Sequence, residues 1–445
     1  MSTTNTTNLA DAARQAVDLA RKKGASEAAA NASRARSVEV QWRDGQLEKI
    51  SEATTRNLSV QLYVDGRYSA VSTSDLRPEA LERFITDSIA MTRVLARDEY
   101  RRLPEPELYL GRAQVDLSLE DPRQAELTAE ERQRFVQQLE AAARAADGKG
   151  SILSVTTGFG DTLRETYRAS SNGFEGGMRG TQFSASADVS VRDSDGRRPE
   201  ESDYSVARFL ENLTDAATLG RRAGERALGR LGATKGASAV LPMAVDNRAA
   251  GRLVSMLLGP MTGAAIQQKR SFLDGKLGER IGSEWLALSD EPHLKRGLGS
   301  RLFDGEGLAA QPLPLFEGGV LRSYFIDSYY GRKLKARPTT GSPSNLSWKL
   351  GDKSREALLA DLKEGILVTG FLGGNSSAVT GDFSFGIQGF RVRDGKLAEP
   401  VGEMNISGNQ LDLWKRLVAV GDDPFLHSAL RTPTLVFEGV QFAGV

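Results

Sequence analysis

Apolar residues follow two different spacings in the first part of the chain. Between residues 9 and 23 they recur with the helical period, and Gly24 is placed to end this helix in a left-handed conformation. Residues 37–43 and 58–62 instead alternate apolar and polar side chains, which is typical of strands with one buried face. Asp-Gly pairs mark the turns, so the pattern predicts two antiparallel hairpins, the second returning through Tyr68.

The same mixture of helices and strands continues to residue 231. A helix is expected from Pro78, which suits a first helical turn, and another from Thr128, where Glu131 completes a capping box. The further expected elements are strands at 152–159 and 163–169, a pair broken by Gly158 and Gly160, a strand at 181–192 and a helix at 214–231. Helices packed on an antiparallel sheet predict an α+β domain over residues 1–231.

The sequence changes character after residues 232–237, which are the best candidate linker. Glycine is frequent from residue 238 to residue 445, and one long helix is expected at 354–364, capped by Ser354 and stopped by Gly365. Short strands are expected at 319–327, 366–372, 382–393, 401–406 and 434–443. Because strongly bent sheets call for glycine, residues 238–445 are predicted to form a β-dominated, barrel-like domain.

An apolar helix opens this second half. It begins behind Asp246 or Asn247, either of which can cap it, and Pro260 must stop it. No His, Glu, Cys or Lys lies between Arg252 and Ile266. The helix therefore offers neither a ligand for a catalytic metal nor an acid or base for proton transfer.

Composition narrows the classes of protein that remain. The 445 residues include 58 Lys plus Arg and 58 Asp plus Glu, which are interspersed, and this argues against binding to nucleic acid or to an anionic membrane. There is no cysteine, which excludes disulfides, thiolate ligands and a cysteine nucleophile. The N-terminus lacks the pattern of a signal peptide, and no apolar run approaches membrane-spanning length, so we expect a cytoplasmic protein.

Candidate catalytic groups are few. The two histidines, His293 and His427, are too far apart in sequence to give metal-ligand spacing. A triad of Ser428, His427 and Asp422 is disfavoured, because adjacent residues rarely orient toward one another and no GxSxG motif is present.

Two further patterns favour turns over binding sites. The glycine-rich segment 370–377 has no lysine at the spacing of a phosphate-binding loop. Carboxylates that could collect a hard cation such as Mg²⁺ or Ca²⁺ are Asp304, Glu306, Asp382, Asp422 and Asp423. Carboxylates beside glycines more often form turns, so a cation site is disfavoured.

Nine short segments follow one another in the second half. They are SFLDGKLGERI (271–281), DEP (290–292), FDGEG (303–307), EGGVLRSY (317–324), TTG (339–341), KEGILV (363–368), GGN (373–375), TGDFSFG (380–386) and ISGN (406–409). In this order they resemble the TldD/PmbA family, which was named for modulation of DNA gyrase and is also classed as a peptidase family. The segment VDGRYSAVSTSD (64–75) extends the resemblance over nearly the whole chain.

The family has two branches that pair with one another. The TldD branch carries a HExxxH helix, whose histidines hold zinc together with a later cysteine and whose glutamate acts on the bound water. Aligning this motif with the apolar helix places Ser255 and Pro260 at the histidines and Met256 at the glutamate. The sequence therefore resembles the PmbA branch, also called TldE, and we expect no catalytic residue and no metal ligand in it.

The resemblance implies a partner. That partner is a TldD-like subunit with HExxxH and zinc, which cleaves flexible or unfolded peptides admitted as extended strands. The alternatives are a homodimeric peptide-binding or scaffold protein that needs no partner, and a modulator of DNA gyrase. We expect no cofactor in this chain, no direct contact with nucleic acid and no membrane association. Residues expected to face the cavity or the partner are Gly373, Gly374, Asn375, Thr380, Gly381, Asp382, Phe383 and Ser384.

Overall fold

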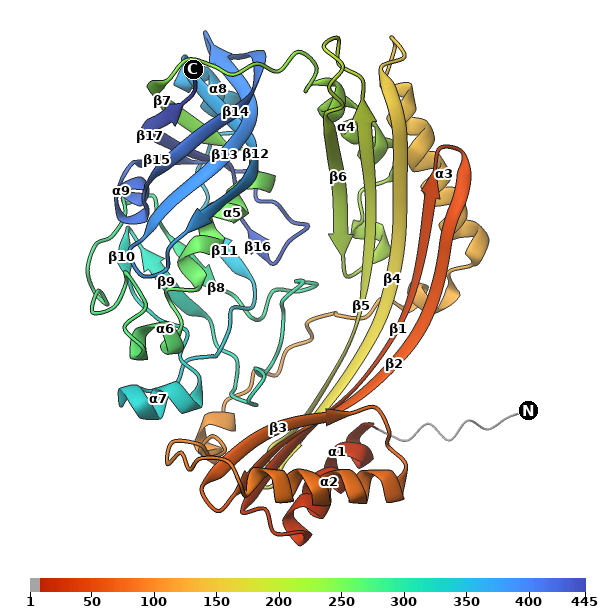
Figure 1. Ribbon diagram of the computed structural model, residues 1–445, viewed down its shortest axis with the longest axis vertical. Helices are drawn as coiled ribbons and strands as arrows, with labels where there is room; N and C mark the ends of the chain where they lie inside the picture. The colour runs from red at the N-terminus through yellow and green to blue at the C-terminus, as the bar shows by residue number, and fades with distance from the viewer. Residues whose placement is uncertain (1–8) are drawn as a thin grey trace.

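The computed structural model describes residues 9–445, which form two halves (Figure 1). The first half is built on one six-stranded antiparallel sheet in the order β3-β2-β1-β4-β5-β6. Its strands are β1 (Glu27–Arg43), β2 (Gln46–Val64), β3 (Arg67–Thr73), β4 (Ile152–Ser170), β5 (Glu175–Val191) and β6 (Glu200–Ala207). Because several of these strands are long, the sheet runs along most of the length of the molecule (Figure 1).

Four helices cover one face of this sheet in two pairs. They are α1 (Leu9–Lys22) and α2 (Pro78–Thr92) at one end, and α3 (Ala129–Ala145) and α4 (Ala216–Leu228) at the other (Figure 1). Leu58 and Leu62 belong to the core under the first pair, and Phe159 and Phe183 to the core under the second. Short 3-10 helices lie at Pro106–Tyr109, Pro122–Glu126 and Leu210–Asn212.

The two predicted hairpins are confirmed: β1 and β2 pair on either side of the turn Asp44-Gly45, β2 and β3 pair on either side of the turn Asp65-Gly66, and the hairpins share strand β2. Residues 37–43 and 58–62 belong to the adjacent strands β1 and β2, which pair over their whole length, and β3 continues the same antiparallel meander. Between Gln46 and Asn57 nearly every side chain of β2 is exposed. The alternation that marks a strand is therefore absent there, and the pattern shows only the ends of the strands.

The predicted break at Gly158 and Gly160 is wrong, because β4 runs through both residues. A β-carbon on Gly160 would lie 3.0 Å from Ser184 Oγ, and one on Gly158 would lie 3.4 Å from Ser186 Oγ. These glycines make room for side chains of the neighbouring strand β5 and form no turn.

The second half contains a curved six-stranded sheet in the order β14-β13-β12-β7-β17-β15. An additional pairing joins β14 to β17 and gives the sheet its barrel-like form, which confirms the predicted fold class. Its strands are β7 (Ala239–Val245), β12 (Gly365–Ser376), β13 (Asp382–Arg393), β14 (Lys396–Asn409), β15 (Leu417–Val420) and β17 (Leu435–Ala443). A smaller sheet contains β8 (Leu288–Asp290), β9 (Leu313–Glu317), β10 (Val320–Leu321), β11 (Leu346–Trp348) and β16 (Leu430–Arg431).

The helices of the second half are α5 (Asn247–Leu258), α6 (Gly263–Gln267), α7 (Ser328–Leu334), α8 (Arg355–Leu362) and α9 (Gln410–Lys415). Helix α8 confirms the helix predicted behind Ser354, although it ends before Lys363, whose φ is +57° and therefore not helical. The strand predicted at 319–327 is wrong. Only Val320–Leu321 form a strand, β10, because Asp327 already caps α7.

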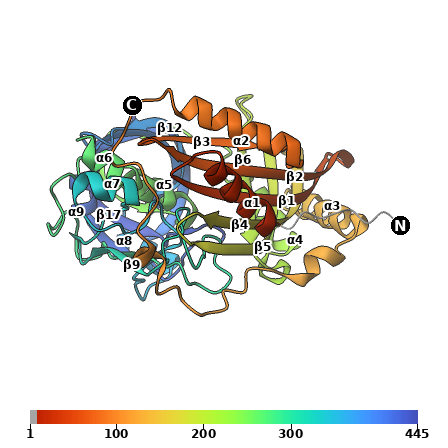
Figure 2. The ribbon, with the colours of Figure 1, turned by 90° about the horizontal axis from the view of Figure 1, so that it is seen from below.

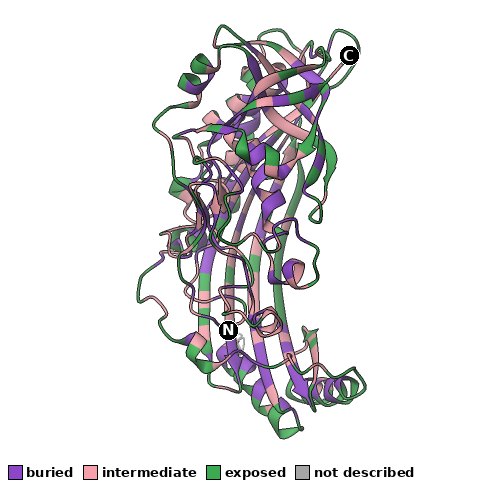
Figure 3. Cartoon of the chain, turned by 90° about the vertical axis from the view of Figure 1, so that its left-hand side faces the viewer, coloured by how far each residue is buried: buried purple, intermediate pink, exposed green. Residues whose placement is uncertain are grey.

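The two halves touch along strand β6 and at the turn between β4 and β5. Tyr204 of β6 packs against Phe425 with ring centroids 5.4 Å apart, and Phe174 packs against Phe303 at 5.1 Å. Figure 2 shows the second half beside the sheet from below, and Figure 3 shows bands of buried and exposed residues along the long strands. Within residues 9–445, no helix combines the length and the apolar character that crossing a membrane requires.

Candidate functional site

Helix α5 starts where the two halves meet. The Asp246 side chain caps it by accepting a hydrogen bond from the Arg248 N–H at 3.1 Å, and it pairs with Arg355 at 3.0 Å. Arg248 reaches toward the first half and donates to the Ser202 carbonyl at 3.0 Å. Leu253, further along α5, is fully buried. The first turns of α5 therefore face β6, while the rest anchors the helix in the core.

A pocket of about 560 Å³ opens beside α5, between the two halves. Glu201 and Tyr204 of β6 form one side. The first turns of α5 up to Arg252, the part of β12 from Thr369 to Gly374, and the loop that leads into β16 form the other sides. The pocket is thus built from segments of the chain that lie far apart in sequence.

Strand β12 presents an unpaired edge to this pocket. It pairs with β7 only from Ile366 to Val368, because the chain leaves the sheet at Asp246 to form α5. On its other side β12 pairs with β13 as far as Ser376. Among the described strands, none lies beside this edge from Thr369 onward. An edge of this kind can pair with an extended peptide through main-chain hydrogen bonds.

Most charged side chains at this junction are matched. The fully buried carboxylate of Asp203 pairs with Arg222 at 2.7 Å and with Arg248 at 3.4 Å. Glu201 accepts a hydrogen bond from Gln388 of the other half, and burial raises the pKa of its carboxyl group. The carboxylates of Asp203 and Glu201 therefore both have partners across the junction, whereas the buried Nε and Nη1 atoms of Arg230 have no hydrogen-bond partner.

Arg252 is different from these neighbours. Its guanidinium lies over the ring of Phe385, 5.0 Å from the centroid, and the residue is exposed. Within residues 9–445, no carboxylate lies within ion-pair distance of it. The pocket therefore contains one cation without a counter-charge.

The sheet face that looks toward the second half carries small and polar side chains. A hollow of about 370 Å³ on this face is lined by Gly158, Gly160, Ser184 and Ser186, among others. The helices cover the opposite face only (Figure 1). Glu39, Gln41 and Lys49 surround these small residues, so the hollow has a small-residue floor and a polar rim.

Family models match three consecutive parts of the chain. The PmbA/TldA metallopeptidase domain 1 matches residues 28–92, the central domain matches 122–231, and the C-terminal domain matches 238–444. The chain belongs to the PmbA/TldD family. The first two models together supply the strands of the single sheet in the first half.

Relatives of this PmbA/TldD chain match it over almost its full length. The metalloprotease PmbA of Escherichia coli O157:H7 is 29% identical over 443 residues, which are 98% of this chain and 96% of the relative. A crystal structure of a candidate modulator of DNA gyrase from Bacteroides thetaiotaomicron is 42% identical, with a TM-score of 0.94 and 98% of both chains covered. TldE from Thermococcus kodakarensis shares the fold, with a TM-score of 0.86 and 21% identity. The match covers 97% of this chain and 100% of that chain.

The positions aligned with the zinc motif of the family do not fit zinc. Ser255 donates its hydroxyl to the Arg252 carbonyl at 2.7 Å, and Met256 is 6% exposed and packs in the core. Pro260 is buried and has no side-chain donor atom, and its carbonyl accepts from the Ser271 hydroxyl at 2.7 Å. Zinc in proteins takes cysteine, histidine and carboxylate ligands, none of which is present at these positions.

The disfavoured triad is not assembled. His427 points into the first half, where its Nδ1 lies 3.1 Å from the Ser205 hydroxyl, and burial lowers the pKa of its imidazole. The Ser428 hydroxyl accepts from the Leu430 N–H at 3.0 Å, and Asp422 is exposed elsewhere on the loop. The second histidine, His293, follows strand β8.

The five candidate cation ligands are distributed over three separate segments, with Asp304 and Glu306 in one, Asp382 in another, and Asp422 and Asp423 in the third. Asp304 accepts from the Leu308 N–H at 3.0 Å, and Asp423 accepts from the Thr434 hydroxyl at 2.7 Å. Glu306 accepts from the Ser328 hydroxyl, and Asp382 from the Thr380 hydroxyl. Within residues 9–445, no three His, Cys, Asp or Glu side chains lie together as a metal site would require.

The residues expected to face a cavity or a partner separate into three groups. Gly373 and Gly374 line the pocket beside α5. Asn375, Thr380, Asp382 and Ser384 are exposed around the turn between β12 and β13. Gly381 and Phe383 are buried, with Phe383 stacked on Phe385 at 5.9 Å between ring centroids.

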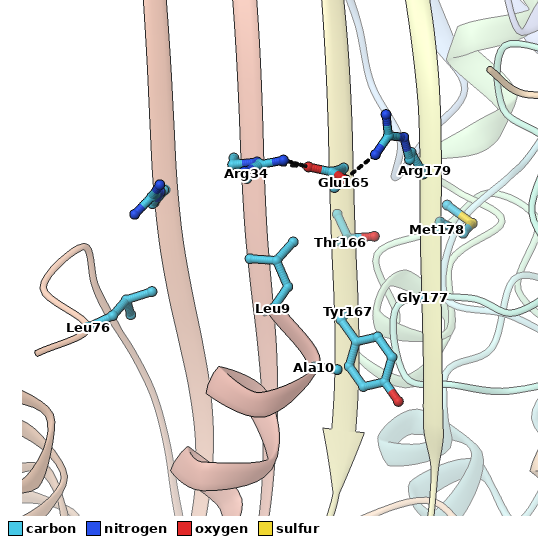
Figure 4. Close-up of a pocket in the computed structure, with 11 residues that line it drawn as sticks. Leu9, Ala10, Arg34, Leu76, Glu165, Thr166, Tyr167, Gly177, Met178 and Arg179 are labelled. Carbon is cyan, nitrogen blue, oxygen red and sulfur yellow. Dashed lines mark hydrogen bonds and ion pairs between the residues drawn. The ribbon is translucent and has the colours of Figure 1, made fainter. Parts of the chain in front are cut away.

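Another pocket, of about 500 Å³, lies on the helix-bearing face of the sheet, next to α1 (Figure 4). Glu165 pairs there with Arg34 at 2.5 Å and with Arg179 at 2.8 Å, across neighbouring strands. This pocket opens on the opposite face from α5 and β12. It is therefore not part of the candidate site.

Three residues of the site are not among those that the sequence predicts: Glu201, Gln388 and Arg252. Glu201 and Gln388 meet across 187 positions of sequence, and no local pattern predicts such a contact. Arg252 and Arg248 do carry a signal in the sequence, because they are the two charged residues of a helix that is otherwise mostly apolar.

Proposed function

We propose that this chain is the non-catalytic subunit of a PmbA/TldD-family zinc metallopeptidase. A partner subunit with HExxxH would supply the zinc, and the complex would act on flexible or unfolded peptides. The observation that carries this proposal is the composition of α5 and the turn that follows it, where Ser255, Met256 and Pro260 stand in place of the motif. The chain keeps the shape of its family but offers no zinc ligand at these positions.

The pocket beside α5 supports a role in holding the peptide. A peptide added to the free edge of β12 would be bound through its main chain, which gives affinity with little dependence on side chains. Gly373 lies in this stretch, and nothing lies within 4 Å of the position of its missing β-carbon, so another backbone can approach closely there; Gly370 and Gly374 instead make room for β13. Only a peptide that can become extended would fit, which favours flexible or unfolded substrates.

Hydrolysis itself would be performed by the partner. Zinc in such a site activates a water molecule, and this chain would contribute binding and the exclusion of bulk solvent. The exposed residues Asn375, Thr380, Asp382 and Ser384 around the β12–β13 turn are proposed to face the partner or the shared cavity.

Purification from the native host tests the proposal. We expect a stoichiometric second chain that bears HExxxH and holds zinc, with hydrolysis of casein-derived peptides appearing only when both chains are mixed. The isolated chain should retain no zinc after dialysis against a chelator and should cleave no peptide. A lone homodimer would favour a partner-independent scaffold. About one equivalent of zinc on the isolated chain, or unaided cleavage, would refute the assignment.

A further inference from the structure

We propose that Arg252 binds a carboxylate of the peptide held at β12. The carboxylate could belong to the C-terminus of the peptide or to an acidic side chain. This inference rests on the proposed function, because it assumes an extended peptide in the pocket beside α5. It adds a chemical preference to a binding mode that would otherwise be independent of sequence.

The charges around the pocket leave Arg252 as the group that needs an anion. Asp203 is matched by two arginines, Asp246 by Arg355, and Glu201 by an amide donor. None of these carboxylates lies within ion-pair distance of Arg252. A carboxylate that enters the pocket therefore gains a cation without breaking an existing ion pair.

The guanidinium of Arg252 is held in place by aromatic rings. It lies over the ring of Phe385, which is fully buried, and Phe371 packs edge-on against that ring at 5.7 Å between centroids. A cation–π contact orients the guanidinium without neutralising its charge. Its N–H groups remain free to form the forked pair of hydrogen bonds that suits a carboxylate.

The position of Arg252 suits a ligand on β12. Arg252 and the edge from Thr369 to Gly374 line the same pocket. Arg248 lines it too, but its side chain is already engaged with Asp203 and with the carbonyl of Ser202. The first turn of α5 faces this pocket as well, and the positive end of its dipole favours a negative charge there.

Three short peptides can test this with the full-length chain alone. Each is an octapeptide of Ala, Ser, Thr and Gly with an uncharged fluorophore at its N-terminus. The three are the free C-terminal acid, the C-terminal amide, and the amide with glutamate as its last residue. Fluorescence anisotropy gives the dissociation constants. Because charge-assisted hydrogen bonds are strong, we expect the free acid to bind roughly tenfold more tightly than the amide.

The variants Arg252→Gln and Arg252→Lys separate charge from folding. In Arg252→Gln the dissociation constants of the acid and the amide peptides should become nearly equal, because the acid loses affinity while the amide binds as before. Arg252→Lys should keep part of the preference for the acid. Arg83→Gln is the matched control, because it removes one exposed positive charge from α2 and should keep the full ratio.

Each outcome has a defined meaning. Equal binding of acid and amide by the wild-type chain, binding of neither peptide, or a preference that survives in Arg252→Gln would overturn the proposal. If the glutamate amide binds like the acid, a side-chain carboxylate suffices; if it binds like the plain amide, the anchor is specific for the C-terminus. These binding experiments do not depend on hydrolysis. If the chain prefers the free-acid peptide but never associates with a peptidase, only the proposed function is refuted and the role of Arg252 stands.

Discussion

Helices α3 and α4 pack so closely that one added methyl group should separate them. Gly220 and Gly224 lie one turn apart on α4, against α3. A β-carbon on Gly220 would lie 2.2 Å from the Leu139 carbonyl oxygen and 2.9 Å from the Ala142 β-carbon. Since the oxygen belongs to a helical backbone, it cannot rotate away, and Gly220→Ala should push the two helices apart.

Two opposing effects determine the size of the change. Alanine in place of glycine inside a helix stabilises it by about 1 kcal/mol. Overpacking of a well-packed contact costs about 1–3 kcal/mol, and a backbone contact at 2.2 Å belongs at or above the upper end of this range. We therefore expect a net loss of about 2 kcal/mol in the local free energy of unfolding of the α3–α4 pair.

Hydrogen exchange followed by mass spectrometry can measure this loss locally. Peptides that cover α3 and α4 should exchange roughly thirtyfold faster in Gly220→Ala, since about 1.4 kcal/mol corresponds to a factor of ten. Gly251→Ala in α5 is the matched control: its β-carbon would have only the Thr432 hydroxyl nearby, at 3.8 Å, so the helix should become slightly more stable. Exchange in α3 and α4 that is unchanged or slower in Gly220→Ala would refute the packing argument.

Three further substitutions test other parts of the structure. Burial lowers the pKa of His427, so the native state favours the neutral ring. The stability that the neutral ring contributes is fully present above about pH 6.5 and is lost as the pH falls. His427→Gln should therefore reduce the fall in melting temperature between roughly pH 7 and pH 5. Asp161→Asn removes the buried ion pair with Arg132, whose N···O distance is 2.6 Å, and should lower the free energy of unfolding in urea by about 3–5 kcal/mol. A decrease below about 1 kcal/mol would mean that the pair is solvated. Gly374→Ala forces a residue with φ of +97° against the Ser384 carbonyl oxygen at 2.2 Å, so exchange should accelerate in β12 and β13, and unchanged protection there would contradict this.

The fold class could be predicted from the sequence because the buried faces repeat locally. Helix α3 was predicted from Thr128 and Glu131, and both sides of this capping box are present. The lengths of β1, β2 and β4 could not be predicted in the same way. Where a strand has polar groups on both faces, as at Gln46–Asn57, the period of two disappears and only strand pairing reveals the element.

The candidate site could be predicted only in part. Gly373 and Gly374 were expected at a cavity, and they line the pocket beside α5. The rest of the pocket depends on how two distant segments meet: β7 ends at Val245, and this exposes the edge of β12 beyond Val368. The sequence indicates where the strands are, but it does not show at which residue one strand continues beyond the end of its neighbour in the sheet.

The arrangement of the helices connects the stability of the first half to the pocket. Among the described helices, those that pack on this sheet lie on its outer face, so the sheet is held in shape mainly from that face, by α1 with α2 and by α3 with α4. Helix α4 packs on β6, and β6 carries Glu201 and Tyr204, which contact the second half and line the pocket. Loosening α4 through Gly220→Ala should therefore shift β6 and weaken the binding of acid and amide peptides equally. Arg252→Gln should weaken binding of the acid peptide and leave binding of the amide peptide unchanged. The two variants therefore distinguish a displacement of β6 at the pocket from the loss of a positive charge.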